Sequence, residues 1–138
     1  MAISYTNIFY ENVLSGVEKL LRTEFDFPVS TLDHHSGSES LLLIPEDDAF
    51  ISHDAGSQTR SYSINIQYQT RMAAMPWEFI TKRSERIKRL IFNNAHYVDT
   101  TYKWHDGFIE SVSYETDEDD DNVRRANISF NCTVRDVL

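Results

Sequence analysis

Cysteine, glycine and proline are scarce in this chain of 138 residues, and long apolar runs are missing from it. The one cysteine, Cys132, can form neither an internal disulfide nor a thiolate zinc site. Four glycines and three prolines exclude the collagen-like and low-complexity classes. The longest apolar run, 41–44, is far shorter than the roughly 20 residues of a membrane-spanning helix, and Glu11 and Glu18 interrupt any secretory signal. We therefore expect no redox chemistry, no membrane partner and no secretory route.

The composition is instead that of a globular domain. Hydrophobic residues make up 41% of the chain and aromatic residues 12%, which is enough to offset the entropy lost on folding. The length fits a single domain over residues 1–138. Lysine and arginine number 13 against 22 aspartates and glutamates, so the net charge of −9 should make the molecule as a whole repel nucleic acid.

Hydrophobic periodicity predicts two helices and several strands. Apolar residues at helical spacing predict helices over 7–22 and 76–92, the second with Pro76 in its first turn and Trp77 facing inward. Alternation predicts an antiparallel strand over 62–70 with one covered face. Further strands are predicted over 41–44, 98–104, 108–115 and 124–134, and 25–32 is predicted to be a connector that enters a first extended piece. We expect an α+β fold, in which a mixed, mostly antiparallel sheet has two helices packed on one face.

Three local features carry expectations about the connections. Pro45 is expected to end the strand 41–44, and the polar segment 46–58 that follows predicts a long loop. The sequence His105-Asp106-Gly107 predicts a tight hairpin between two strands, because Asp-Gly accepts the positive φ angles of such a turn. Gly16, inside the first helix, predicts a close contact between that helix and the sheet.

Two patches of opposite charge depart from the average. The second predicted helix carries five cations, and the segment between the last two strands carries six carboxylates. The cations are Lys82, Arg83, Arg86, Lys88 and Arg89, and the carboxylates are Glu115, Asp117, Glu118, Asp119, Asp120 and Asp121. Ordinary solvated surfaces have the same composition. Because the two charges are complementary, we expect a head-to-tail contact between identical subunits that closes a ring.

No set of residues with catalytic or metal-binding spacing is evident. Counted from Asp117, carboxylates occupy the first, third and fifth positions of a calcium loop, but Asn122 and Ile128 replace the glycine and glutamate that such a loop requires. The five histidines lack the spacing of zinc hydrolases, and neither a nucleophile elbow nor a glycine-rich phosphate loop is present. We expect no catalytic activity and no cofactor. The less favoured alternative is a small metal-binding domain that uses the histidines and the acidic segment.

Aromatic residues are frequent in the second half of the chain. They include Tyr97, Tyr102, Trp104, Phe108 and Tyr114. A sheet with such side chains can stack nucleic-acid bases, but binders of that kind add a basic groove, and Lys103 is the only Lys or Arg over 97–121. We therefore predict that these aromatic side chains form core and subunit contacts.

The order of elements resembles that of the tail terminator, or tail-completion, proteins of long-tailed bacteriophages. The similarity covers most of the chain: an amphipathic N-terminal helix, the alternating strand 62–70, the helix 76–92, and a final strand that includes Ala126-Asn-Ile-Ser-Phe-Asn-Cys-Thr-Val134. The resemblance implies a structural virion protein that assembles into a ring, expected to be a hexamer. Such a ring caps the tail tube, ends tail polymerisation and joins the tail to the head or neck.

The resemblance also implies partners and a location. The partners are further copies of the chain, the tail tube protein, and a neck or connector protein. DNA is expected to pass through the lumen without specific binding, since a surface without fixed cations does not hold phosphate. The location is the tail and neck of the virion, after assembly in the host cytoplasm. Another phage neck or head-completion adaptor, or a connector subunit, is the alternative.

Overall fold

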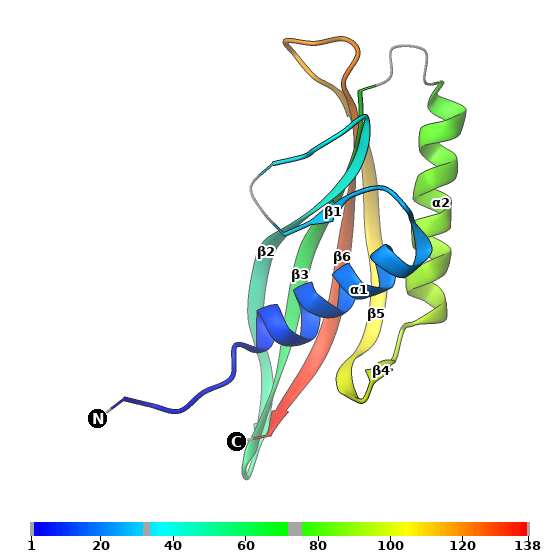
Figure 1. The fold of residues 1–138 in the computed structure, drawn as a ribbon. Helices are drawn as coiled ribbons and strands as arrows, with labels where there is room; N and C mark the ends of the chain where they lie inside the picture. Colours follow the sequence, from blue (N-terminus) through cyan, green and yellow to red (C-terminus); the bar gives the residue numbers. More distant parts are fainter. Residues whose placement is uncertain (1, 32–33, 72–75, 138) are drawn as a thin grey trace.

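Six strands form one mixed sheet in the order β1-β2-β3-β6-β5-β4, curved into a half-barrel (Figure 1). This computed structural model describes residues 2–31, 34–71 and 76–137. The strands are β1 (Val29–Ser30), β2 (Glu39–Asp54), β3 (Ser57–Thr70), β4 (Tyr97–Asp99), β5 (Thr101–Thr116) and β6 (Arg124–Val137). β1 runs parallel to β2, and the other neighbouring pairs are antiparallel. The predicted α+β class with a mostly antiparallel sheet is confirmed.

Two helical regions pack on one face of this sheet (Figure 1). A π-helical segment, η1 (Phe9–Leu14), continues directly into α1 (Ser15–Glu24), and α2 (Trp77–Asn93) follows the helix-starting Pro76. The prediction of one α-helix over 7–22 is therefore wrong for its first turns. In η1 the carbonyl of Glu11 accepts a hydrogen bond from Lys103 Nζ at 3.2 Å, and a side chain that competes for a helix carbonyl disturbs the regular ladder.

The core lies between the helices and the inward-facing side chains of β2, β3, β5 and β6. Its largest fully buried members are Trp104, Tyr68, Phe130, Leu21, Leu41, Leu43, Ile64, Ile66, Ile80, Ile87, Ile91 and Ile128. Trp104 lies at its centre, with its ring edge-on to Phe130 at 5.3 Å between centroids. The ring also covers Gly16, where an added Cβ would lie 2.6 Å from Trp104 Cζ3. The close helix–sheet contact predicted at Gly16 is confirmed.

The segment 46–58 is strand rather than the predicted loop. β2 continues through Pro45 to Asp54, turns at Ala55-Gly56 and returns as β3, in which Ser57 already pairs with Asp54. Pro45 does not end the strand, because it lies at a break in the β2–β3 register, between Pro45 and Asp47, and proline is tolerated at such bulges. The hairpin could not be predicted from hydrophobicity, because its strands are held by hydrogen bonds between backbone groups, which do not require apolar side chains.

The predicted hairpin at His105-Asp106-Gly107 is also wrong, because β5 runs without interruption through these residues. Asp106 does have the positive φ expected of it, 53°, but the residue forms a bulge where the β5–β6 register shifts between His105 and Phe108. The actual turn lies earlier, at Thr100 between β4 and β5, with φ of 56°. A positive φ marks both kinds of irregularity, and the sequence alone does not distinguish them.

The inward stripe of α2 is confirmed at Ile80, Ile87 and Ile91, which are all fully buried. Trp77 is not part of it: the residue is 41% exposed, and its ring contacts Tyr114 edge-on at 5.9 Å. The indole sits in the first turn of α2, outside the buried stripe, and forms a small surface cluster with Tyr114. The prediction that Trp77 faces inward is therefore wrong.

Candidate functional site

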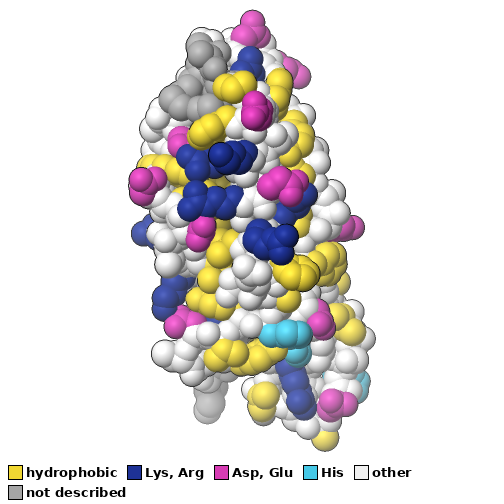
Figure 2. Space-filling view, turned by 90° about the vertical axis from the view of Figure 1, so that its right-hand side faces the viewer, with side chains coloured by type: hydrophobic (Ala, Val, Ile, Leu, Met, Phe, Trp, Pro, Cys, Tyr) yellow, Lys and Arg dark blue, Asp and Glu magenta, His cyan; other side chains and the backbone are white. Residues whose placement is uncertain are grey.

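The cationic face of α2 is the most concentrated patch of positive charge on this side of the molecule (Figure 2). Two of its five cations form ion pairs with other elements of the chain. Arg83 Nε donates to Glu39 Oε1 at 2.7 Å, and its guanidinium lies 4.6 Å from the Phe79 ring centroid. Arg86 Nε donates to Glu24 Oε1, also at 2.7 Å. These two arginines join α2 to the last residue of α1 and to the start of β2, and this structural role was not predicted.

The other three cations of α2 face solvent. Lys88 pairs with Glu85 on the same helix at 2.6 Å, with side chains 41% and 70% exposed, which is an arrangement that contributes little to stability. Arg89 lies over the ring of Phe92, and Lys82 is exposed one turn before Arg86. The part of the predicted patch available to a partner is therefore Lys82, Lys88 and Arg89.

A groove runs between the C-terminal half of α2 and the neighbouring stretch of β5. It has a volume of 440 Å³ and is lined by Glu85, Lys88, Arg89, Phe92, Gly107, Phe108 and Ile109. Phe92 is 72% exposed and Phe108 is 53% exposed, which is unusual for large apolar side chains. The two cations of the rim, Lys88 and Arg89, outnumber its one carboxylate, Glu85, so the groove suits a partner that carries both apolar and acidic side chains. This groove could not be predicted from the sequence, because it is formed by residues far apart in the chain.

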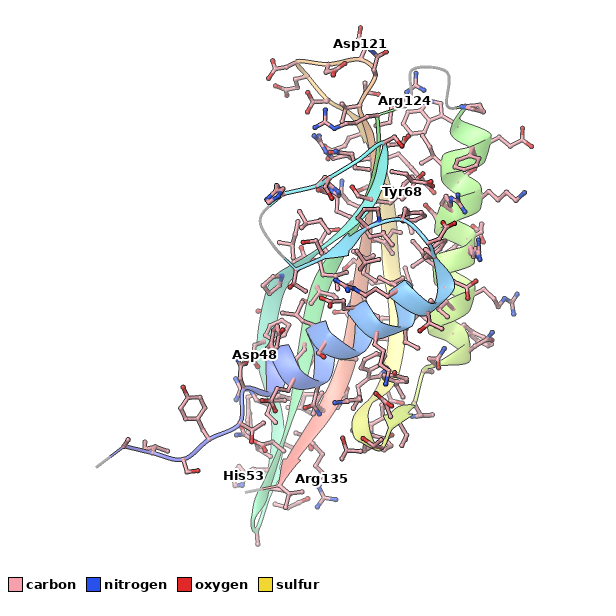
Figure 3. All side chains as sticks on the ribbon, viewed as in Figure 1. Asp48, His53, Tyr68, Asp121, Arg124 and Arg135 are labelled. Carbon is pink, nitrogen blue, oxygen red and sulfur yellow. The ribbon has the colours of Figure 1, made fainter. Side chains whose placement is uncertain are left out.

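The predicted acidic patch forms the turn between β5 and β6, at the end of the sheet where α2 begins (Figure 3). Asp117 pairs with Arg125 at 3.0 Å, and this hydrogen bond, together with backbone N–H groups, holds the pKa of Asp117 below its ordinary value. Backbone N–H groups of Asp119 and Asn122 donate to Asp117 and Asp120. Glu115 accepts from Asn127. The turn is ordered by its own carboxylates, and Glu118, Asp119 and Asp121 are left pointing into solvent.

The structure does not bring the two predicted patches together within one chain. Among the ion pairs of the described residues, none joins a cation of α2 to a carboxylate of the acidic turn, and Figure 1 places that turn beyond the N-terminal end of α2. Their pairing between two subunits stays a prediction.

A second acidic surface, which the sequence did not predict, lies at the opposite end of the sheet. We call residues 45–54 of β2 the β2 arm. Its side chains are exposed throughout and include the large apolar residues Phe50 and Ile51, at 53% and 51%. They also include Glu46, Asp47 and Asp48, of which Asp48 pairs with Arg60 at 2.7 Å. The sequence does show apolar residues inside an acidic segment here, but the polar composition of that segment predicts a loop and not a strand.

The sheet face opposite the helices is polar; its middle is uncharged, whereas Arg125 and Arg135 lie near the two ends of β6 on this face. Its middle holds a chain of hydrogen bonds in which His35 bonds Gln67, the Gln67 amide donates to Asn127 Oδ1 at 2.9 Å, and Asn65 donates to the same oxygen at 3.0 Å. Burial lowers the pKa of His35 below its ordinary value, against the opposing effect of its bond to Gln67. The amide and hydroxyl groups in the middle of this face offer no fixed positive charge to a phosphate backbone.

The described residues show neither a metal-ligand cluster nor a membrane-spanning helix. Within residues 2–31, 34–71 and 76–137, no group of three or more His, Cys, Asp or Glu side chains could hold a metal ion. No helix of the described chain is long and apolar enough to span a membrane. Of the predicted core aromatics, Tyr97 and Trp104 are buried, whereas Tyr102, Phe108 and Tyr114 are 49%, 53% and 41% exposed. For those three, the prediction of a place in the core is therefore wrong, and their role as subunit contacts stays a prediction.

Comparison of the chain with protein-family models and with curated proteins finds no match in either set.

Proposed function

We propose that this chain is a structural subunit of a closed ring, expected to be a hexamer, at the head-proximal end of the tail tube of a long-tailed bacteriophage. There it ends tail polymerisation and joins the tail to the neck. The observation that carries the proposal is the pair of unlike surfaces at the two sides of the curved sheet: an acidic, apolar β2 arm and a cationic, apolar groove beside β5. Two different complementary surfaces on one subunit support head-to-tail assembly, which closes into a ring when the rotation permits.

The polar face of the sheet supports a role around DNA. With the helices on the outside of such a ring, the side chains facing the lumen would be those of the strand positions opposite the core, such as Ser63, Asn65, Asn127 and Ser129. Neutral amides and hydroxyls at these positions would let DNA pass without holding its phosphates, and the two arginines on this face of β6, Arg125 and Arg135, are paired with Asp117 and Asp54. The proposed partners are thus further copies of the chain, the tail tube protein on one side and a neck or connector protein on the other. The proposed location is the virion, after assembly in the host cytoplasm.

The test combines assembly with a tail-capping assay. Purified protein is examined by native mass spectrometry and negative-stain electron microscopy, where we expect closed rings of a single stoichiometry. Rings added to polymerising tail tube protein should bind one end of each tube and stop its growth. Protein that forms rings but binds a portal or connector instead of tubes would indicate a neck adaptor. A strict monomer at high concentration would contradict the proposal.

A further inference from the structure

The sheet has a long unpaired edge on each side. Within the described ranges, β2 has a ladder partner on its outer side only at Leu41 and Leu42, where β1 pairs with it. On the outer side of β5, β4 pairs with residues up to Trp104, and Gly107 N–H donates to Ala95 O at 2.8 Å. From there to Thr116, β5 presents backbone donors and acceptors with no strand beside them in the described chain. Free edges of this length are templates for another strand.

The two edges are compatible in direction. The neighbours β2, β3, β6 and β5 alternate antiparallel, so β2 runs opposite to β5. A second copy that added its β2 to the outer edge of β5 would therefore form one more antiparallel pair. The same step repeated from copy to copy would extend a curved sheet around an axis.

The register places complementary residues at the same level. Asp47 is aligned with Ser63, Ser63 with Asn131, and Asn131 with Phe108, so one row crosses the sheet from the β2 arm to the groove. In a ring whose axis follows the strands, this level of the arm meets Lys88 and Arg89 beside the β5 edge of the next copy. Asp47 itself shares a face with Ser63, away from the helices, so the carboxylate on the helix side is that of the next residue, Asp48, which is aligned with Tyr62. Phe50 and Ile51 supply apolar side chains for a surface that already exposes Phe92 and Phe108.

We propose that the occupant of the α2–β5 groove is the β2 arm of a second copy of this chain, whose outer edge pairs with β5. The inference rests on the ring assembly proposed above and names its contact. It assigns the cations of α2 an acidic partner other than the turn 117–123. That turn projects beyond the N-terminal end of α2 (Figure 1), whereas the groove lies beside its C-terminal half, so rotation about an axis along the strands keeps the two apart.

Charge exchange tests the contact. The variant K88E/R89E makes the groove acidic, and E46K/D48K makes the arm basic. Each alone should raise the concentration needed for half-assembly at least about tenfold, because like charges then face each other. The combined variant restores opposite charges and should assemble as the wild type does, as measured by sedimentation velocity. Circular dichroism and thermal unfolding check that each variant is folded, which is expected because Glu46, Asp48 and Arg89 are exposed and the Lys88 side chain is 41% exposed.

The matched control is D119K/D121K, which reverses the same amount of charge on the acidic turn. Combined with K88E/R89E, it should not restore assembly. Restoration by this control, or wild-type assembly of both single-surface variants, would overturn the contact while leaving the ring and its tail-capping role intact. Conversely, rings that follow the charge-exchange pattern but do not stop tube growth would support the contact and contradict the phage function.

Discussion

Gly16 of α1 lies directly against the ring of Trp104 in β5, so closely that a Cβ on the glycine would come within 2.6 Å of Trp104 Cζ3. Trp104 is fully buried, and its indole N–H donates to the carbonyl of Asn94 at 3.1 Å, which fixes the ring in place. The contact joins the first helix, the β5 strand and the end of α2. It therefore sets how closely the N-terminal helical region approaches the sheet.

Gly16→Ala should destabilise the protein by about 1–3 kcal/mol, the usual cost of overpacking a well-filled core. Alanine is the better helix former by about 1 kcal/mol, so a net loss of stability would show that the steric clash exceeds the gain in helix propensity. The measurement is the urea midpoint of unfolding. Ser15→Ala, at the neighbouring exposed position, is the control and should be neutral or slightly stabilising. Equal stability of Gly16→Ala and wild type would contradict the close contact.

Helix spacing and one glycine were enough to predict this part of the fold. The buried stripe at Ile80, Ile87 and Ile91 and the alternation along β3 and β6 followed from periodicity, since each element has one face in the core. The β2 arm could not be predicted in that way. Its side chains are exposed on both faces, so it shows no alternation, and only its backbone pairing with β3 makes it a strand.

The candidate site was predicted in part for the same reason. The cations of α2 were evident from charge alone, but charge could not show that Arg83 and Arg86 are bound to Glu39 and Glu24. These pairs link residues far apart in sequence, as does the groove beside β5. Tertiary contacts decide which charges are structural and which face a partner.

Glu39 is predicted to matter more for stability than any exposed carboxylate of α2. It accepts hydrogen bonds from both Arg83 and the Tyr68 hydroxyl at 2.7 Å, and burial raises the pKa of that hydroxyl, with the nearby carboxylate adding to the effect. Glu39→Gln leaves the half-buried guanidinium without its anion and should cost about 2–4 kcal/mol in chemical unfolding. Glu85→Gln, which removes the exposed partner of Lys88, should cost less than about 1 kcal/mol. Similar losses for the two variants would contradict a structural role of Arg83.

His35 should make stability depend on pH below neutrality. Its Nδ1 and Nε2 bond Ser40 and Gln67, and burial lowers the pKa of the imidazole below the ordinary value of 6.5. Between the folded and unfolded pKa values the unfolded chain binds more protons, so the free energy of unfolding falls as the pH drops below about 6.5. Urea unfolding at pH 7.5 and pH 5.5 should show a smaller decrease for His35→Gln than for wild type. His34→Gln, at the exposed neighbouring position, should retain the wild-type decrease.

The proposed contact makes a prediction about ring size that single variants cannot test. K88E/R89E has an acidic groove and an acidic arm, whereas E46K/D48K has a basic groove and a basic arm. In a mixture, each arm faces a groove of opposite charge only when the two variants alternate around the ring, and alternation closes without a mismatch only for an even number of subunits. Equimolar mixing should therefore restore hexamers that contain three copies of each variant, resolved by native mass spectrometry when one variant is isotopically labelled. Random composition of the mixed rings would contradict the contact, and restoration only as open chains would contradict an even-numbered ring.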